Sequence, residues 1–222
     1  GAKAGPRCTN PGGFFHPGSW RRQLSRTDPY SFGFTNPVHD AQRSFRQLLD
    51  AMSHPGRLTC LVPLAAPTPL YGATLTTLLT LADNTTPVCL NLACNTALVR
   101  DVLALHSGAP VTNRTDQAVF AVLDARDAFD ADLYKSDDED YPDRSCTLIV
   151  QCGGEESDKQ ACFLKGPGLQ NSMKTLLPHM HPSLAGYLFS RHNRFPLGLD
   201  LILTRGDSVY CLPRSTVVSE AT

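Results

Sequence analysis

Short apolar runs alternate with longer amphipathic segments along this chain, and this alternation restricts its possible folds more than any other feature. Apolar runs bounded by Gly, Pro, Asn or Asp indicate strands, and apolar residues at three- and four-residue steps indicate helices. The predicted helices cover 37–53, 73–82, 95–105, 128–134 and 182–190, and the predicted strands cover 57–62, 86–92, 117–123, 145–151, 161–164, 199–204 and 208–212. Strand–helix alternation followed by paired strands predicts an α/β fold, a mixed β-sheet with helices on both faces.

The first 33 residues differ from the rest, because they are rich in Gly and Pro and show no sustained periodicity. We therefore expect a poorly structured N-terminal extension at 1–33 and a single α/β domain at 34–222. A chain of 222 residues buries enough surface to fold without a metal or a disulfide. The segment at 135–144, KSDDEDYPDR, is interpreted as a solvated acidic loop, with a carboxylate site for a divalent metal as the alternative.

The charge balance argues against two classes of partner. The formal net charge is −1 and no basic stripe is present, so we expect no nucleic acid partner. No apolar run is long enough for a membrane span, and no leading apolar core resembles a signal peptide, so we expect no membrane partner. The eight scattered cysteines contain no CxxC pair and are interpreted as buried free thiols in a cytoplasmic protein.

Familiar catalytic motifs are absent from the sequence. It contains no GxGxxG, GxxxxGK[ST], GxSxG or HExxH motif, and its His and Cys residues do not pair at metal-ligand spacing. The KGPG segment at 165–168 is interpreted as a tight structural turn, with an anion-binding nest as the alternative. Lys165 is a poor candidate for a Schiff-base lysine. We therefore predict no catalytic residues, no cofactor and no metal.

Charged residues follow a regular pattern on the helix at 37–53. Asn36 and Pro37 suit its start, and HPG at 54–56 suits its end. The spacing predicts ion pairs between Asp40 and Arg43 and between Arg46 and Asp50. This face is either self-paired and solvated, or it holds a partner subunit or an anionic ligand, which guanidinium groups on a rigid helix suit. The apolar stripe of the same helix consists of Val38, Ala41, Phe45, Leu48, Leu49 and Met52.

Three further residues are weaker candidates for ligand or interface contacts. His54 follows the C-terminus of the first helix, where the helix dipole favours its cationic form, so it is interpreted as a cap with a ligand role as the alternative. Asp83 and Asn84 follow the second helix, where turn chemistry and ligand contact are both open.

Four sequence blocks resemble the PhnH family, a subunit of the bacterial carbon–phosphorus lyase system. The first block is PVHDAQRSFRQLLDAMSHPG at 37–56, and the second is LLTLADNTTPV at 78–88. The others are FPLGLDLIL at 195–203 and LPRST at 212–216. The blocks have the order and approximate separation found in the family and span almost the whole body of the chain. Residues 1–31 and the acidic 135–144 segment have no counterpart in the family pattern.

This resemblance implies a fold, a partner set and a pathway. The fold is expected to be similar to the large domain of transferases that depend on pyridoxal phosphate (PLP), without PLP, and the protein is expected to form a homodimer. The family acts with PhnG, PhnI and PhnJ in phosphonate catabolism, in the step that forms α-D-ribose 1-alkylphosphonate 5-triphosphate from ATP and a phosphonate. The nucleosidase-type and radical steps are attributed to PhnI and PhnJ. This chain is therefore expected to have a structural or assembly role.

The alternative to an assembly role is a small-molecule site. In that interpretation a pocket at the dimer interface binds a phosphonate or a nucleotide. The residues expected to contribute to ligand binding or to the interface are Asp40, Arg43, Arg46, His54, Asp83 and Asn84.

Overall fold

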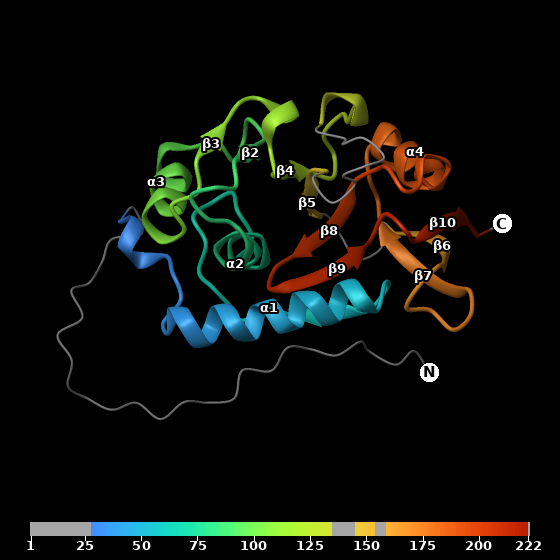
Figure 1. Ribbon diagram of the computed structural model, residues 1–222, viewed down its shortest axis with the longest axis horizontal. Helices are drawn as coiled ribbons and strands as arrows, with labels where there is room; N and C mark the ends of the chain where they lie inside the picture. The colour runs from blue at the N-terminus through green and yellow to red at the C-terminus, as the bar shows by residue number, and fades with distance from the viewer. Residues whose placement is uncertain (1–27, 135–144, 154–158, 222) are drawn as a thin grey trace.

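Within the described part of the chain, the main sheet is mixed and has seven strands (Figure 1). The computed structural model describes residues 28–134, 145–153 and 159–221. The strand order is β1-β9-β8-β5-β4-β2-β3, in which β8, β5, β4, β2 and β3 are parallel, whereas β9 is antiparallel to β8 and to β1. The strands are β1 (Leu58–Cys60), β2 (Val88–Leu90), β3 (Val111–Thr112), β4 (Phe120–Asp124), β5 (Thr147–Gln151), β8 (Asp200–Arg205) and β9 (Ser208–Leu212). The predicted α/β class and mixed sheet are confirmed.

A second, three-stranded antiparallel sheet was not predicted. It has the order β10-β6-β7 and consists of β6 (Lys159–Lys165), β7 (Met173–Pro178) and β10 (Val217–Glu220). The sequence indicated only the middle of β6, as a strand at 161–164. In β10 a single residue, Val218, is buried, so the strand has too little apolar alternation to be recognised from its own sequence.

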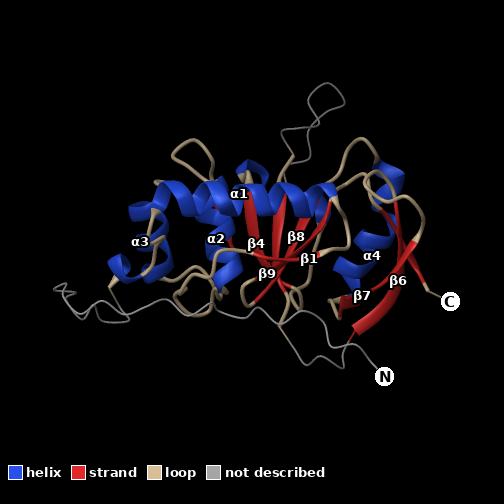
Figure 2. Cartoon of the chain, turned by 90° about the horizontal axis from the view of Figure 1, so that it is seen from below, coloured by secondary structure: helices blue, strands red, loops and turns tan. Residues whose placement is uncertain are grey.

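The helices divide unequally between the two faces of the main sheet. They are α1 (Pro37–Ser53), α2 (Gly72–Leu81), α3 (Ala97–His106) and α4 (Pro182–Ser190), with short 3-10 helices at Pro29–Ser31, Thr115–Gln117, Ala131–Leu133 and Arg191–Arg194. Along β5, Ile149 packs in the core that contains α2 and α3, whereas Leu148 and Val150 pack in the core that contains α4 and the small sheet. The second face is therefore shared between a helix and a sheet, as Figures 1 and 2 show.

The first helix begins and ends where its sequence predicts. The Asn36 side chain accepts a hydrogen bond from the His39 N–H at 3.5 Å, and Pro37 occupies the first turn. Leu48 and Ala51 are buried and pack against β9 and α2. In Figure 2 the helix runs in front of the main sheet along much of the molecule.

Several local predictions need correction. Thr96, rather than Asn95, caps α3, and its hydroxyl accepts from the Val99 N–H at 3.2 Å. The helix predicted at 128–134 is a single 3-10 turn, Ala131–Leu133. Strands predicted at 57–62 and 86–92 are shorter, because only their central residues join the ladder.

A buried arginine and a partly buried arginine–aspartate pair hold the C-terminal blocks together. The Arg191 guanidinium donates to the carbonyl oxygens of Leu212 at 3.0 Å, Pro213 at 2.9 Å and Thr216 at 3.1 Å. Nearby, Arg214 binds the Asp200 carboxylate through Nε at 3.1 Å and Nη2 at 2.7 Å. The FPLGLDLIL and LPRST blocks therefore meet through these hydrogen bonds, which give them a structural role.

The cysteines mostly follow the prediction. Cys89, Cys94, Cys146, Cys152, Cys162 and Cys211 are buried free thiols. Cys60 is a correction, because it is disulfide-bonded. Cys8 lies outside the described residues.

Part of the predicted N-terminal extension is described. Residues 1–27 lie outside the described part, as does the acidic segment 135–144. Pro29 and Phe32 lie against the α2–α3 region, where the Pro29 carbonyl oxygen is 3.0 Å from His106 Nε2 and Phe32 is buried. The division into an extension at 1–33 and one domain at 34–222 stays a prediction. None of the described helices combines the length and hydropathy of a membrane-spanning helix.

Candidate functional site

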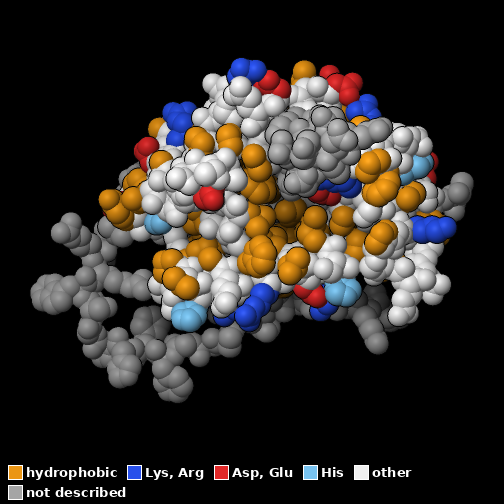
Figure 3. Space-filling model, viewed as in Figure 1, with side chains coloured by type: hydrophobic (Ala, Val, Ile, Leu, Met, Phe, Trp, Pro, Cys, Tyr) orange, Lys and Arg blue, Asp and Glu red, His pale blue; other side chains and the backbone are white. Residues whose placement is uncertain are grey.

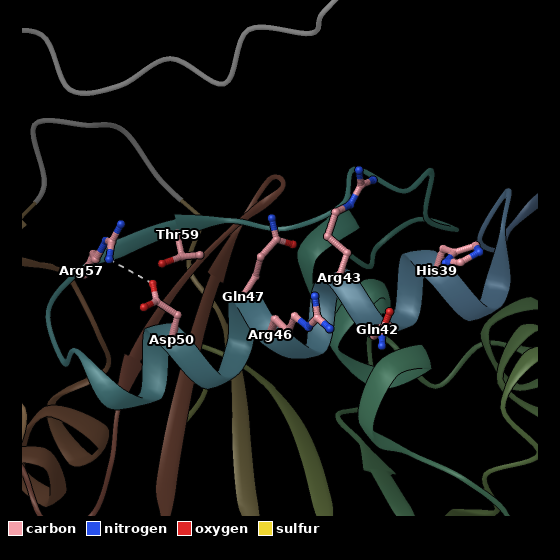
Figure 4. Close-up of a pocket in the computed structure, with 8 residues that line it drawn as sticks. All are labelled: His39, Gln42, Arg43, Arg46, Gln47, Asp50, Arg57 and Thr59. Atoms are coloured by element: carbon pink, nitrogen blue, oxygen red, sulfur yellow. Dashed lines mark hydrogen bonds and ion pairs between the residues drawn. The ribbon is translucent and has the colours of Figure 1, made fainter.

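A polar groove of about 470 Å³ runs between α1 and β1 (Figure 4). Most of its side chains come from one face of α1, and Arg57 and Thr59 come from the start of β1. Three of the lining residues are arginines. The groove is lined by His39, Gln42, Arg43, Arg46, Gln47, Asp50, Arg57 and Thr59.

The local sequence explains why these side chains share one groove. Residues 39, 43, 46 and 50 recur at three- and four-residue steps, so they project from one side of a helix. The HPG turn then reverses the chain, so that β1 lies beside the helix it follows. Gly56 has φ +89° there, and a Cβ at this position would overlap the side chain of Met173. The turn therefore favours glycine for its backbone conformation, since the overlap involves only the flexible end of the Met173 side chain.

The ion pairs of the groove differ in part from those predicted. Arg43 Nη2 lies 3.4 Å from Asp40 Oδ1, as the spacing predicts. The predicted Arg46–Asp50 pair is wrong, because Asp50 instead accepts from Arg57 Nη1 at 3.0 Å. Arg46 makes no hydrogen bond or ion pair with any residue of the described part of the chain. One of the three guanidinium groups is therefore left without a counter-charge there.

Asp40 and His54 also have helix-capping roles. Asp40 Oδ2 accepts from the Asn36 N–H at 2.9 Å, which satisfies a donor just before the helix. His54 Nδ1 lies 3.0 Å from the Asp50 carbonyl oxygen and 3.2 Å from the Asp50 carboxylate. His54 does not line the groove, although it shares Asp50 with Arg57.

Asp83 and Asn84 lie away from this groove, at the end of α2. The Asp83 carboxylate accepts from the Thr85 N–H at 2.8 Å and the Thr85 hydroxyl at 2.7 Å, and the Thr86 hydroxyl lies 3.3 Å from it. These hydrogen bonds, that of the Thr85 hydroxyl first, lower the pKa of Asp83 below its usual value. This geometry agrees with the turn interpretation, and the structure does not bring Asp83 or Asn84 together with the arginines.

Two buried polar atoms of the groove lack partners. Gln47 Oε1 and Thr59 Oγ1 are shielded from solvent and have no hydrogen-bond partner among the described residues. Such orphaned groups cost free energy and commonly mark an absent water, ion or ligand. The sequence analysis missed Gln47, Arg57 and Thr59. Only the short distance along the chain between the helix end and the strand start pointed to Arg57 and Thr59.

An exposed apolar stripe lies beside the groove on the same helix. Val38, Phe45 and Leu49 are 76%, 49% and 56% exposed, whereas a helix packed on a core buries its large apolar side chains. These positions are separated by seven and four residues, so they follow one line along α1. Figure 3 shows hydrophobic side chains next to charged ones along the lower edge of the molecule, where α1 lies in Figure 1. The predicted apolar stripe is therefore only partly used by the core.

The remaining candidate segments have structural contacts. Gly168 of the KGPG turn has φ +82°, and a Cβ there would overlap the Ser53 carbonyl oxygen, so the turn packs tightly on the end of α1. His181 caps α4, and its Nδ1 accepts from the Ser183 N–H at 3.3 Å. In the described part of the chain, no group of three or more His, Cys, Asp or Glu residues is placed to hold a metal ion.

Comparisons with known proteins agree with the resemblance seen in the four sequence blocks. The family described as "Bacterial phosphonate metabolism protein (PhnH)" matches residues 32–219. A protein of Rhizobium meliloti named "Alpha-D-ribose 1-methylphosphonate 5-triphosphate synthase subunit PhnH" is 37% identical over 190 residues, which cover 84% of this chain and 94% of the relative. A Stutzerimonas stutzeri protein named "Putative C-P lyase subunit protein HtxG" is 30% identical over 185 residues, covering 80% and 85%. The chain therefore belongs to the PhnH family of bacterial phosphonate metabolism proteins.

Proposed function

We propose that this chain is a subunit of a carbon–phosphorus lyase core complex, alongside PhnG-, PhnI- and PhnJ-type subunits. The complex acts in the step that forms α-D-ribose 1-alkylphosphonate 5-triphosphate from ATP and a phosphonate. Support comes from the family match over 32–219 and from the two relatives, whose names describe a synthase subunit and a carbon–phosphorus lyase subunit. In this proposal the chain has no reaction centre of its own and acts in the assembly of its companions.

The exposed apolar stripe of α1 is the observation that carries this proposal. An aligned row of large apolar side chains on a rigid helix is typical of a surface that another protein covers. Arginine side chains on the adjacent helix face resemble the polar rim of such an interface. We place the contact with a companion subunit, or with a second copy in a homodimer, on this stripe.

Finer features belong to the same proposal: the homodimer and the fold similarity rest on the family resemblance, and the cytoplasmic location and the absence of a metal rest on the cysteine and histidine pattern of the sequence. The protein is a cytoplasmic homodimer. Its fold is similar to the large domain of PLP-dependent transferases, without PLP. No cofactor and no metal is required by the chain itself.

Co-purification of the full chain with its three companions tests the assembly role. Replacing Phe45 and Leu49 together by serine should release the companions, because the variant loses two apolar anchors of the stripe. Both side chains are about half exposed, so the chain itself should remain folded. Leu92→Ser is the matched control, because Leu92 is 96% exposed on a loop after β2.

Retention of all companions by the Phe45/Leu49 variant, together with an unchanged oligomeric state, would refute the stripe as the interface. Turnover of a phosphonate by the purified chain alone would refute the absence of an independent reaction centre. An equal loss of companions in the Leu92 variant would show that the effect is not local to α1.

A second candidate function is favoured by the arginine groove. In this function the chain binds a phosphonate or a nucleotide and presents it at an interface of the complex. Arg43 and Arg46 are the residues that both the sequence and the geometry support, whereas Asp83 and Asn84 lie elsewhere.

A further inference from the structure

We propose that the groove between α1 and β1 binds an extended anion that carries two or more phosphoryl groups. Arg43, Arg46 and Arg57 supply the charge, and Thr59 with Gln47 supplies further hydrogen bonds. This inference rests on the second candidate function, whose ligand class it names, and it is tested separately from the assembly role.

The charge of the groove is the first argument. Its lining contains three guanidinium groups and one carboxylate, Asp50, so arginines outnumber carboxylates by two. Asp50 is already engaged by Arg57 at 3.0 Å, and the Arg43–Asp40 contact is long at 3.4 Å. Arg46 has no counter-charge in the described part of the chain. Most of the guanidinium donors therefore remain open to an anion.

The spacing of the groups is the second argument. Arg43 and Arg46 are separated by about 4.5 Å along the helix axis, and the stretch from His39 to Asp50 spans about 16 Å, at the usual rise of about 1.5 Å per residue. Figure 4 shows Arg43 and Gln47 extending from α1 on the side of β1, with Arg46 lying along the helix between them. The cationic groups therefore follow a line, which suits an elongated ligand better than a single compact ion.

The hydrogen-bonding geometry of guanidinium groups favours phosphoryl groups as the anionic part of the ligand. Each guanidinium presents its donors in a planar fork that binds phosphoryl oxygens in a bidentate manner. A phosphoryl group offers three acceptor oxygens and up to two negative charges, so two such groups can engage all three arginines. A groove of about 470 Å³ is large enough for a small polyphosphate.

The orphaned polar atoms are an independent observation that points to a ligand. Thr59 Oγ1 is buried without a partner in the described residues, although a hydroxyl can donate one hydrogen bond. Gln47 Oε1 is also unpartnered, but it is an acceptor, so this side chain binds an anion through its amide N–H groups after the amide turns over. Both side chains line the groove, so rotation about their side-chain torsions turns these groups toward a bound anion.

Titration of the full chain with inorganic triphosphate at low ionic strength tests the proposal by calorimetry. We expect saturable binding that weakens in high salt, because the groove is open to solvent. Arg46→Gln should raise Kd by about 10- to 100-fold, the effect of removing charge-assisted hydrogen bonds. Thr59→Val should raise Kd by about 2- to 10-fold, through one neutral donor.

Arg114→Gln is the matched control. Arg114 is as exposed as Arg43, at 63% against 62%, and pairs with Asp116 far along the chain from α1. The substitution changes the net charge equally, so its Kd should stay within about twofold of the original, as for an independent distant site.

Three results would overturn the proposal. They are the absence of saturable triphosphate binding, an equal effect of Arg114→Gln and Arg46→Gln, and citrate binding as tight as triphosphate binding. The last result would assign the groove to carboxylates, such as those of an acidic protein surface. Because these titrations use the chain without companions, their failure leaves the assembly role intact. Loss of companions in the Phe45/Leu49 variant likewise does not measure anion binding.

Discussion

Arg191 is 1% exposed and has the largest fully buried side chain among the described residues, so replacing it with methionine is a severe test of the hydrogen bonds at the C-terminal blocks. Burial lowers the pKa of the Arg191 guanidinium to about 10, which still leaves it charged at neutral pH. Methionine is of comparable length and apolar, so it fills much of the space but donates no hydrogen bond. The variant therefore separates packing from hydrogen bonding.

The expected loss of stability in Arg191→Met follows from the three short hydrogen bonds of the Arg191 side chain. The Pro213 carbonyl oxygen keeps a second donor, the Thr216 N–H at 2.9 Å, and Leu212 is paired with Leu201 in the β8–β9 ladder, so only the Thr216 carbonyl oxygen depends on the guanidinium. Leaving the Thr216 carbonyl unsatisfied costs about 1–3 kcal/mol, and losing the guanidinium bonds to Leu212 and Pro213 costs about 1 kcal/mol each. Removing a buried charge offsets part of this, because its desolvation no longer opposes folding. We expect the free energy of unfolding to fall by about 2–4 kcal/mol.

Urea unfolding of the full chain measures this change through the transition midpoint, provided the slope stays constant. Arg194→Met is the control in the same 3-10 helix. Arg194 binds Asp132 at the surface, and such exposed pairs contribute about 0–1 kcal/mol. Arg191→Lys should lie between the original and the methionine variant, because lysine keeps the charge but not the planar fork. A loss below about 1 kcal/mol for Arg191→Met, or equal losses at 191 and 194, would refute the reasoning.

Two further predictions concern the turn on α1 and a buried thiol. Gly168→Ala should lower the free energy of unfolding by about 2 kcal/mol or more, because a Cβ there would overlap the Ser53 carbonyl oxygen. Gly206→Ala is the control and should cost about 1 kcal/mol, because Gly206 has φ +56° but open space around it. Equal urea midpoints for the two variants would contradict this prediction. Burial raises the pKa of the Cys152 thiol from 9.0 to about 12, so its contribution to stability is fully present below pH 9.0 and is lost as the pH rises toward 12. Cys152 should therefore be alkylated far more slowly at pH 8 in the native chain than in urea, and equal rates by mass spectrometry would show that it is not buried.

The elements predicted well are those whose signals are local. The start of α1 depends on Asn36 and Pro37, and its end on the HPG turn, so all the information lies within a few residues of each boundary. Of the two missed strands of the small sheet, β7 pairs with β6, the strand just before it in the chain, whereas β10 depends on a distant partner. Val217 of β10 pairs with Lys165 of β6, about fifty residues earlier in the chain. The hydrophobic pattern of one strand does not reveal its pairing register with a strand so far away in the sequence.

The candidate site shows the same division. The Asp40–Arg43 pair lies within one helical turn and was predicted from spacing alone. The expected Arg46–Asp50 pair was lost because Arg57 reaches Asp50 across the turn, at 3.0 Å. Arg57 and Asp50 meet only because the chain turns after α1 and β1 then lies beside the helix. The same arrangement brings Thr59 into the groove.

The two proposed roles of α1 meet at adjacent residues. Phe45 belongs to the exposed stripe and Arg46 to the groove, and successive residues of a helix differ by about 100° around its axis. A companion subunit that covers Phe45 therefore lies at the border of the groove and excludes water from one side of it. Electrostatic attraction between Arg46 and an anion strengthens as the local dielectric constant falls. Assembly and anion binding on this helix are consequently linked, and each should favour the other through the shared burial of one helix face.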